Sequence, residues 1–176
     1  AKNFACDGYV GMGYSQVIGA VVIVNGVEYK YSSNGSYVAG GYEYDETAKL
    51  ATIYDVDGLK KFAEQVTGGK SFAGETIVLA ADIDLKGEEW KPIGMGGKHF
   101  EGTFDGNGHT IANFYHNTWE MKGDHNWYTP EEQYYRDGMG LFGRVYGGTV
   151  KNLTVENFSS DGEIATTGVI SAYADG

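Results

Sequence analysis

A short pattern that recurs in the second half of the chain constrains the fold more than any other feature. The sequence TIANF at Thr110–Phe114 matches TVKNL at Thr149–Leu153, and a glycine-rich turn precedes each. GLFG at Gly140–Gly143 matches GVIS at Gly168–Ser171, 28 positions later. Repeats of about 20 to 50 residues stack, and each buries its apolar face on its neighbours. The repeat predicts the coils of a short parallel β-helix, with inward-facing asparagines in a hydrogen-bonded ladder.

The first 54 residues have the pattern of a small antiparallel meander. Residues 21–24 (VVIV) are β-branched, and Asn25-Gly26 favours a tight hairpin turn before residues 27–31, which alternate between faces. A further glycine pair, Gly40-Gly41, precedes the short run 42–44 (YEY). We therefore expect an aromatic-rich β-hairpin subdomain over residues 1–54.

One helix is predicted directly after this segment. Asp55 or Asp57 can cap its first turn, and Gly68-Gly69 ends it. The apolar residues recur at helical spacing: Leu59, Phe62, Ala63 and Val66. From Glu75 onward the period changes to two, with a run of inward strand residues: Ile77, Leu79, Ile83 and Leu85. The pattern predicts a second unit over residues 55–176, in which this helix caps the coils.

Composition restricts the partners. The chain has 24 acidic and 13 basic residues and a net charge of -11, so nucleic acid and an anionic membrane surface are unfavourable partners. No run of about 18 apolar residues occurs, so no membrane span is predicted. The single cysteine, Cys6, excludes an internal disulfide and a multi-cysteine zinc site, and we expect a structural thiol there.

Several segments together resemble a known repeat family. They are WKPIG at Trp90–Gly94, FEGTFDGNGHTIANF at Phe100–Phe114, GLFG at Gly140–Gly143 and GTVKNL at Gly148–Leu153. They are similar to the GLUG-type repeat region of bacterial surface and adhesin-like exported proteins. The resemblance covers about Asp55 to Gly176. It implies an all-β, right-handed parallel β-helix on a bacterial protein that is secreted or displayed at the cell surface.

The sequence departs from that family at two places. An aromatic insertion occupies residues 117–138, where the family has a short turn. The array also stops at Gly176, where another strand of the Thr-Ile-x-Asn type would be expected. We expect an open C-terminal coil, which either continues in a longer array or is covered by the N-terminal strands or by another copy.

The insertion carries the candidate ligand-binding residues. Aromatic rings with a polar edge suit stacking on sugars and the centre of protein interfaces. An equally good interpretation is that they fold the loop back over the core. The candidates are Trp119, Trp127, Tyr128, Tyr134, Tyr135 and His125. The predicted partner is a glycan or a protein of a host or neighbouring cell.

Catalytic and metal-binding patterns are weak. Asp82 and Asp84 share one strand face and are candidate Ca²⁺ ligands, as in β-helical polysaccharide lyases. No cluster of Arg or Lys accompanies them to abstract a proton, and Asp105–Gly108 favours a tight turn over a calcium loop. No hydrolase nucleophile motif or metal-binding histidine spacing occurs. No cofactor is expected.

The leading hypothesis is therefore a non-catalytic extracellular module for binding, adhesion or display. One alternative is a structural subunit that stacks head to tail into an extracellular fibre, through its open C-terminal coil and its N-terminal strands. The other is a carbohydrate-active β-helix enzyme, a polysaccharide lyase or hydrolase that uses Asp82 or Asp84.

Overall fold

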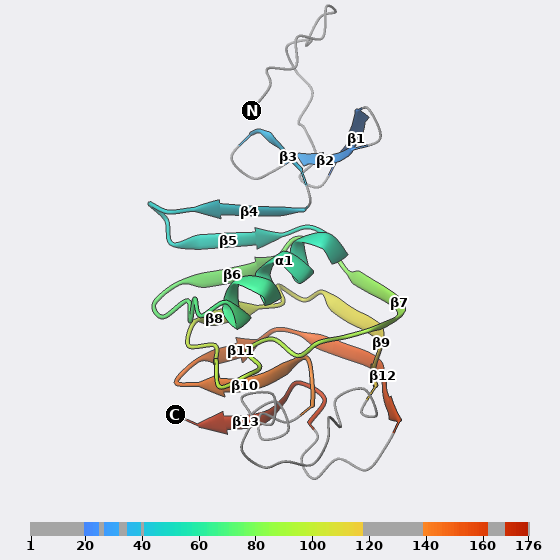
Figure 1. Cartoon of the computed structure of the whole chain (residues 1–176). Helices are drawn as coiled ribbons and strands as arrows, with labels where there is room; N and C mark the ends of the chain where they lie inside the picture. The colour runs from blue at the N-terminus through green and yellow to red at the C-terminus, as the bar shows by residue number, and fades with distance from the viewer. Residues whose placement is uncertain are drawn as a thin grey trace, which may run out of the picture.

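The computed structural model describes residues 20–24, 27–31, 35–39, 41–117, 139–161 and 168–175. These residues are mostly β-structure and contain one helix (Figure 1). The elements are β1 Val21–Val24, β2 Val27–Tyr31, β3 Tyr37–Ala39, β4 Tyr42–Asp45, β5 Leu50–Ile53, α1 Val56–Thr67, β6 Thr76–Leu79, β7 Ile83–Glu89, β8 Thr103–Asp105, β9 Thr110–Asn117, β10 Phe142–Tyr146, β11 Thr149–Lys151, β12 Thr154–Asp161 and β13 Ser171–Asp175.

The N-terminal strands form an antiparallel sheet of three strands in the order β1-β2-β3. Val24 pairs with Val27, which confirms the predicted hairpin, although its turn residues lie outside the described residues. The run 42–44 does not extend this meander. It lies in β4, which pairs antiparallel with β5 in a different sheet. Gly41, in the left-handed region at φ 55°, precedes β4.

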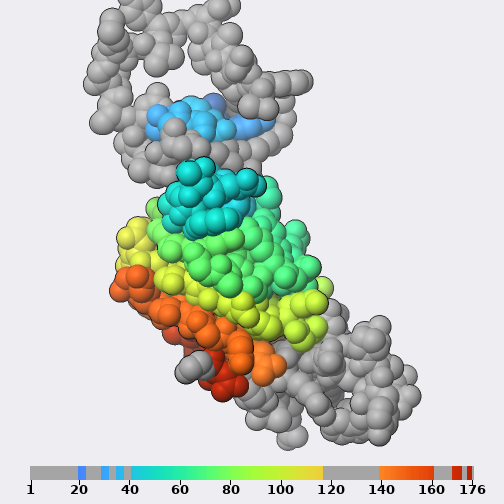
Figure 2. All heavy atoms as spheres, turned by 90° about the vertical axis from the view of Figure 1, so that its left-hand side faces the viewer, coloured from blue at the N-terminus to red at the C-terminus, as the bar shows by residue number. Residues whose placement is uncertain are grey.

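The remaining strands pair mainly in parallel. One ladder runs β5-β6-β8-β11, a second β7-β9-β12 and a third β10-β13. The first of these sheets is mixed, because β4 joins it in the antiparallel sense. Successive parts of the chain therefore follow one another along the molecule, as the colours in Figure 2 show.

The strand register corrects the repeat alignment. Thr110 pairs with Thr154, so TIANF lies beside TVENF at Thr154–Phe158 and not beside TVKNL. Thr149 instead pairs with Thr103. The alignment failed because TVKNL begins in β11, the strand equivalent to β8, whereas TIANF begins β9, the next strand along the chain. The match of GLFG with GVIS is also displaced by one residue, because Phe142 pairs with Ser171 and not with Ile170.

The asparagine ladder is present, but it lies at the surface and not in the interior. Asn113 Nδ2 donates to Asp84 Oδ1 at 2.8 Å, and Asn157 Nδ2 donates to Asn113 Oδ1 at 2.9 Å. Both asparagines adopt left-handed backbone conformations, with φ of 60° and 53°. This conformation interrupts the strand alternation, so that Ile111 and Phe114, three positions apart, are both buried. The asparagine between them is thereby left outside.

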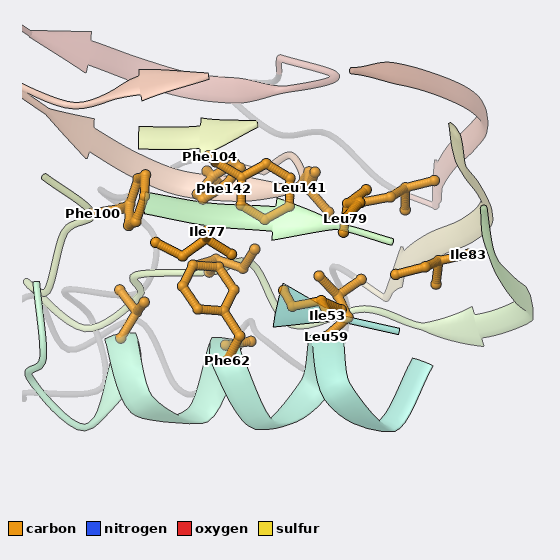
Figure 3. Close-up of a cluster of buried hydrophobic side chains, with 14 of the residues drawn as sticks. Ile53, Leu59, Phe62, Ile77, Leu79, Ile83, Phe100, Phe104, Leu141 and Phe142 are labelled. Atoms are coloured by element: carbon orange, nitrogen blue, oxygen red, sulfur yellow. The ribbon is translucent and has the colours of Figure 1, made fainter. Parts of the chain in front are cut away.

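The helix α1 covers one end of the apolar interior. Asp55 is its N-cap and accepts a hydrogen bond from Gly58 N at 2.9 Å, while Gly68 ends the helix. Figure 3 shows Leu59 and Phe62 pointing from α1 into the apolar interior. The predicted helix and its apolar face are confirmed. The period-two prediction is confirmed as well, since all four inward residues are buried: Ile77, Leu79, Ile83 and Leu85.

Candidate functional site

The aromatic candidates of the insertion lie outside the described residues, as does Cys6. This holds for all six binding candidates: Trp119, Trp127, Tyr128, Tyr134, Tyr135 and His125. What the structure does define is the base of the insertion, since β9 ends at Asn117 and the described chain resumes at Met139. The base is part of the packed core, because Met139 and Leu141 are buried.

A buried histidine joins the segments that meet at this base. The His116 side chain has no exposed surface. Its Nδ1 lies 2.6 Å from the carbonyl oxygen of Trp90, and its Nε2 lies 3.1 Å from that of Gly140. Trp90 follows β7 and Gly140 precedes β10, so one ring links β9 to two other segments. Trp90 Nε1 adds a bond of 3.0 Å to Leu141 O.

The surroundings of His116 favour the neutral ring. The centroid of the His116 ring lies 6.1 Å from that of Phe114 and 5.3 Å from that of Phe158. Burial lowers the pKa of His116, and the hydrogen bonds to the two carbonyl oxygens raise it only in part. A neutral imidazole has a single N–H and can donate to only one of two carbonyl acceptors. The shorter distance favours Trp90 as that acceptor.

A pH-dependent loss of stability follows. Because the pKa of His116 is lower in the folded state than the unperturbed value of 6.5, the unfolded chain takes up the proton more readily. Stability is therefore expected to fall as the pH drops below about 6.5, through the folded pKa. Urea unfolding midpoints at about pH 7.5 and about pH 5.5 should drop more for the wild type than for His116→Gln. Equal drops in both proteins would contradict the assignment, because every other titrating group is common to both.

The period-two alternation of β9 would have predicted that His116 is buried. Phe114 and His116 are two apart in β9 and are both buried, so they share the inward face. In the sequence, His116 directly precedes the polar, aromatic insertion, which hides its membership of the strand. Its two carbonyl contacts could not be foreseen, because they come from segments 26 and 24 residues away.

The two candidate metal ligands accept hydrogen bonds from the next strand. Asp82 Oδ1 accepts from Thr110 N and lies within bonding distance of His109 Nδ1, both at 3.0 Å. Asp84 Oδ1 accepts from Asn113 Nδ2 and from Lys86 N, both at 2.8 Å. These contacts lower the pKa of both carboxyls, so each stays ionised.

The described residues contain no group of three His, Cys, Asp or Glu side chains that could hold a metal ion. Calcium binding and carbohydrate cleavage at Asp82 and Asp84 stay predictions. The geometry shows a structural role for both carboxylates. Asp82, in the turn before β7, binds His109 and Thr110 at the start of β9. Asp84, in β7, binds Asn113 in β9.

The turn after β8 repeats this arrangement. Asp105 Oδ1 accepts from Asn107 N at 2.9 Å and from Asn152 Nδ2 at 3.0 Å, and these bonds lower the pKa of the carboxyl. Asn107 and Gly108 have φ of 52° and 81°, which confirms the predicted tight turn. The surface turns of successive strands are thus linked by side-chain hydrogen bonds.

Comparison with known proteins gives no relative. The chain matches no protein-family model, no curated protein and no solved structure. Among the described residues, no helix is long and apolar enough to cross a membrane.

Proposed function

We propose that the protein is a non-catalytic extracellular module for binding, adhesion or display, secreted by a bacterium or displayed on its surface. Its scaffold is a short right-handed parallel β-helix, and the insertion at residues 117–138 presents the ligand-binding side chains. The scaffold proposal is supported by three ladders of parallel strands. The binding proposal is carried by one observation: the described residues on both sides of the insertion are packed into the core, since His116 before it and Met139 after it are buried.

A rigid base matters for binding. Loops held by a packed scaffold are frequent binding sites, and a loop whose ends are fixed loses less conformational entropy when it meets a ligand. The proposed partner is a glycan or a protein of a host or neighbouring cell, since exposed Trp and Tyr rings suit both. The net charge of -11 disfavours nucleic acid.

A glycan array tests this function. We expect Trp119→Ala/Trp127→Ala to lose binding that the wild type shows, because the stacking rings are removed. Tyr37→Ala is the matched control, since Tyr37 is 40% exposed on β3, in the separate N-terminal sheet. Unchanged binding by the double variant would remove the insertion as the site. A wild type that binds no glycan would exclude that partner class and leave cell-surface proteins, to be tested with labelled cells.

The alternative of a fibre subunit also has a structural basis. Within the described residues, β11, β12 and β13 each pair on one side only. The interior side chains near them are only partly buried: Val150, Leu153, Val155 and Phe158. An unpaired edge with apolar neighbours can pair with another chain. Light scattering should then show association that rises with concentration and that Val155→Lys reduces. A monomer at every concentration would contradict the fibre.

A further inference from the structure

Lys70 places its ammonium between two aromatic rings of the chain itself. Lys70 Nζ lies 3.6 Å from the centroid of the Tyr44 ring and 4.1 Å from that of the Phe72 ring. It also forms an ion pair of 3.2 Å with Glu75 Oε2, a buried oxygen that has no hydrogen-bond partner in the described part of the chain. We call Tyr44, Phe72 and Glu75 the aromatic cage. Ring faces and a carboxylate both attract a cation, so the cage is a cation site that Lys70 occupies.

The backbone fixes Phe72 and Glu75 without any contribution from the Lys70 side chain. Ser71 O accepts a hydrogen bond from Glu101 N at 2.8 Å. Glu75 N donates to Phe72 O at 2.9 Å, and Glu75 O accepts from Thr103 N at 2.9 Å. Phe72 has a φ of 59°, a left-handed conformation that is strained for a bulky residue. Such strain persists only where the surrounding structure imposes it, and it is common at ligand sites.

Tyr44 is fixed on the other side of the cage. Its backbone pairs with Ala51 in the hairpin of β4 and β5, and its ring is partly buried against the apolar core. Burial raises the pKa of Tyr44, and the Glu75 carboxylate beside the ring raises it further, so the phenol keeps its proton. The cage and Lys70 lie within residues 41–117, which the structure describes without a gap. The walls of the cage are therefore formed before any ligand arrives.

The Lys70 side chain can leave the cage directly into water. It is 35% exposed, so its ammonium does not have to cross the core. A lysine side chain is flexible, and its ammonium is strongly hydrated in water. A ligand cation that replaced Nζ would take its position against both rings and would reach the buried Glu75 oxygen from there. Because a buried carboxylate without a counter-charge is unfavourable, the departure of Lys70 favours such a replacement.

We propose that the aromatic cage binds a quaternary ammonium group, such as the trimethylammonium end of choline, which displaces Lys70. A primary ammonium ligand would gain nothing over Lys70, which has the same chemistry and is already tethered beside the cage. A quaternary ammonium has no N–H group to keep solvated, so it loses less on entering the cage, while the released lysine recovers its hydration. The exchange therefore favours the quaternary cation.

The charges beside the cage select a ligand without a phosphate. Besides Lys70, the charged groups that act on Tyr44 are Glu75, Glu46 and Lys49, so two carboxylates face one ammonium. The net charge of -11 adds to the repulsion of an anion. Choline should accordingly bind better than phosphocholine. The cage shares no residue with the insertion at 117–138, so this binding is independent of the function proposed above.

Isothermal titration calorimetry with choline and tetramethylammonium tests the proposal. Lys70→Ala should tighten the Kd for both about tenfold relative to the wild type, because no ammonium has to be displaced. Lys70→Ala/Tyr44→Ala should lose this gain, whereas Lys70→Ala/Tyr44→Phe should keep it, since phenylalanine retains the ring face. The neutral isostere of choline, in which carbon replaces nitrogen, should not bind. Trp119→Ala/Trp127→Ala should bind choline like the wild type.

Acetylation of the wild type provides a second measurement that needs no variant. Choline should raise the rate at which acetic anhydride modifies Lys70, measured by mass spectrometry of peptides, because the displaced amine is exposed. Lys86 is the internal control, since it is exposed on β7 and should react at the same rate with and without choline.

Three results would overturn the cage as a ligand site. The first is the absence of binding of either cation to the wild type and to a Lys70→Ala variant that keeps the circular dichroism of the wild type. The second is equal binding of the neutral isostere, and the third is unchanged binding after Tyr44→Ala. If Lys70→Ala does not fold, the wild type decides, because Lys70 acetylation that choline leaves unchanged would contradict the displacement.

Discussion

Phe62→Ala is expected to lower the free energy of unfolding by about 3 to 5 kcal/mol. The ring has no exposed surface and meets three other phenylalanines. Its centroid lies 5.2 Å from that of Phe72 and 5.7 Å from those of Phe100 and Phe104. Removing it takes away the main apolar contact between α1 and the strand core, and the packed neighbours cannot close the cavity fully. Urea unfolding followed by circular dichroism measures the loss.

Two further variants separate packing from the mere removal of a ring. Phe62→Leu keeps most of the volume, and we expect a loss of about 1.5 kcal/mol or less. Phe158→Ala removes the same ring from a partly buried position on β12, and we expect a loss of about 1 to 2 kcal/mol. Similar losses for Phe62→Ala and Phe158→Ala would show that α1 is not packed on the interior as the structure has it.

Local patterns in the sequence predicted the elements that depend on neighbouring residues. The helix follows from the spacing of Leu59, Phe62 and Val66 and from the capping carboxylate of Asp55, all within one segment. The inward strand residues follow from a period of two. In both cases, residues a few positions apart decide which face is buried, so no knowledge of distant segments is needed.

Strand pairing depended on features that the repeat pattern does not contain. TIANF in β9 resembles both TVKNL, which begins in β11, and TVENF in β12, and only the register shows that it pairs with TVENF while β11 pairs with β8. The left-handed residues Asn113 and Asn157 then place the ladder outside. A repeat shows that units are equivalent, whereas the hydrogen-bonded register between distant strands decides which residues meet.

The parts of the candidate site differ in how much of each can be predicted from the sequence. Aromatic clustering pointed to residues 117–138, and the structure adds the buried His116 at the base of this insertion. Nothing in the sequence pointed to the contacts of His116, because Trp90 and Gly140 lie 26 and 24 positions away from it. A contact between distant segments is a property of the folded chain, so local patterns cannot predict it.

Gly58→Ala is expected to destabilise the protein by about 3 kcal/mol, although the same change in an exposed helix stabilises by about 1 kcal/mol. A Cβ at Gly58 would lie 2.0 Å from the carbonyl oxygen of Gly41 and 2.6 Å from its carbon. Those are backbone atoms, and Gly41 O is also fixed by a hydrogen bond of 2.7 Å from Tyr54 N. The first turn of α1 must therefore move away from β4, which disturbs the Asp55 cap.

Gly68→Ala provides the matched control for this close approach. Gly68 has an ordinary φ of -71°, and a Cβ there would meet Glu64 O at 3.1 Å, which a small shift relieves. We expect its effect to stay within about 1 kcal/mol in urea unfolding. Gly58→Ala with wild-type stability would contradict the contact between α1 and the turn before β4. If the expected difference is found, close packing of α1 on the turn before β4 requires glycine at position 58, although alanine would favour the helix more. Any side chain at this position would push the first turn of α1 away from the strands on which it packs.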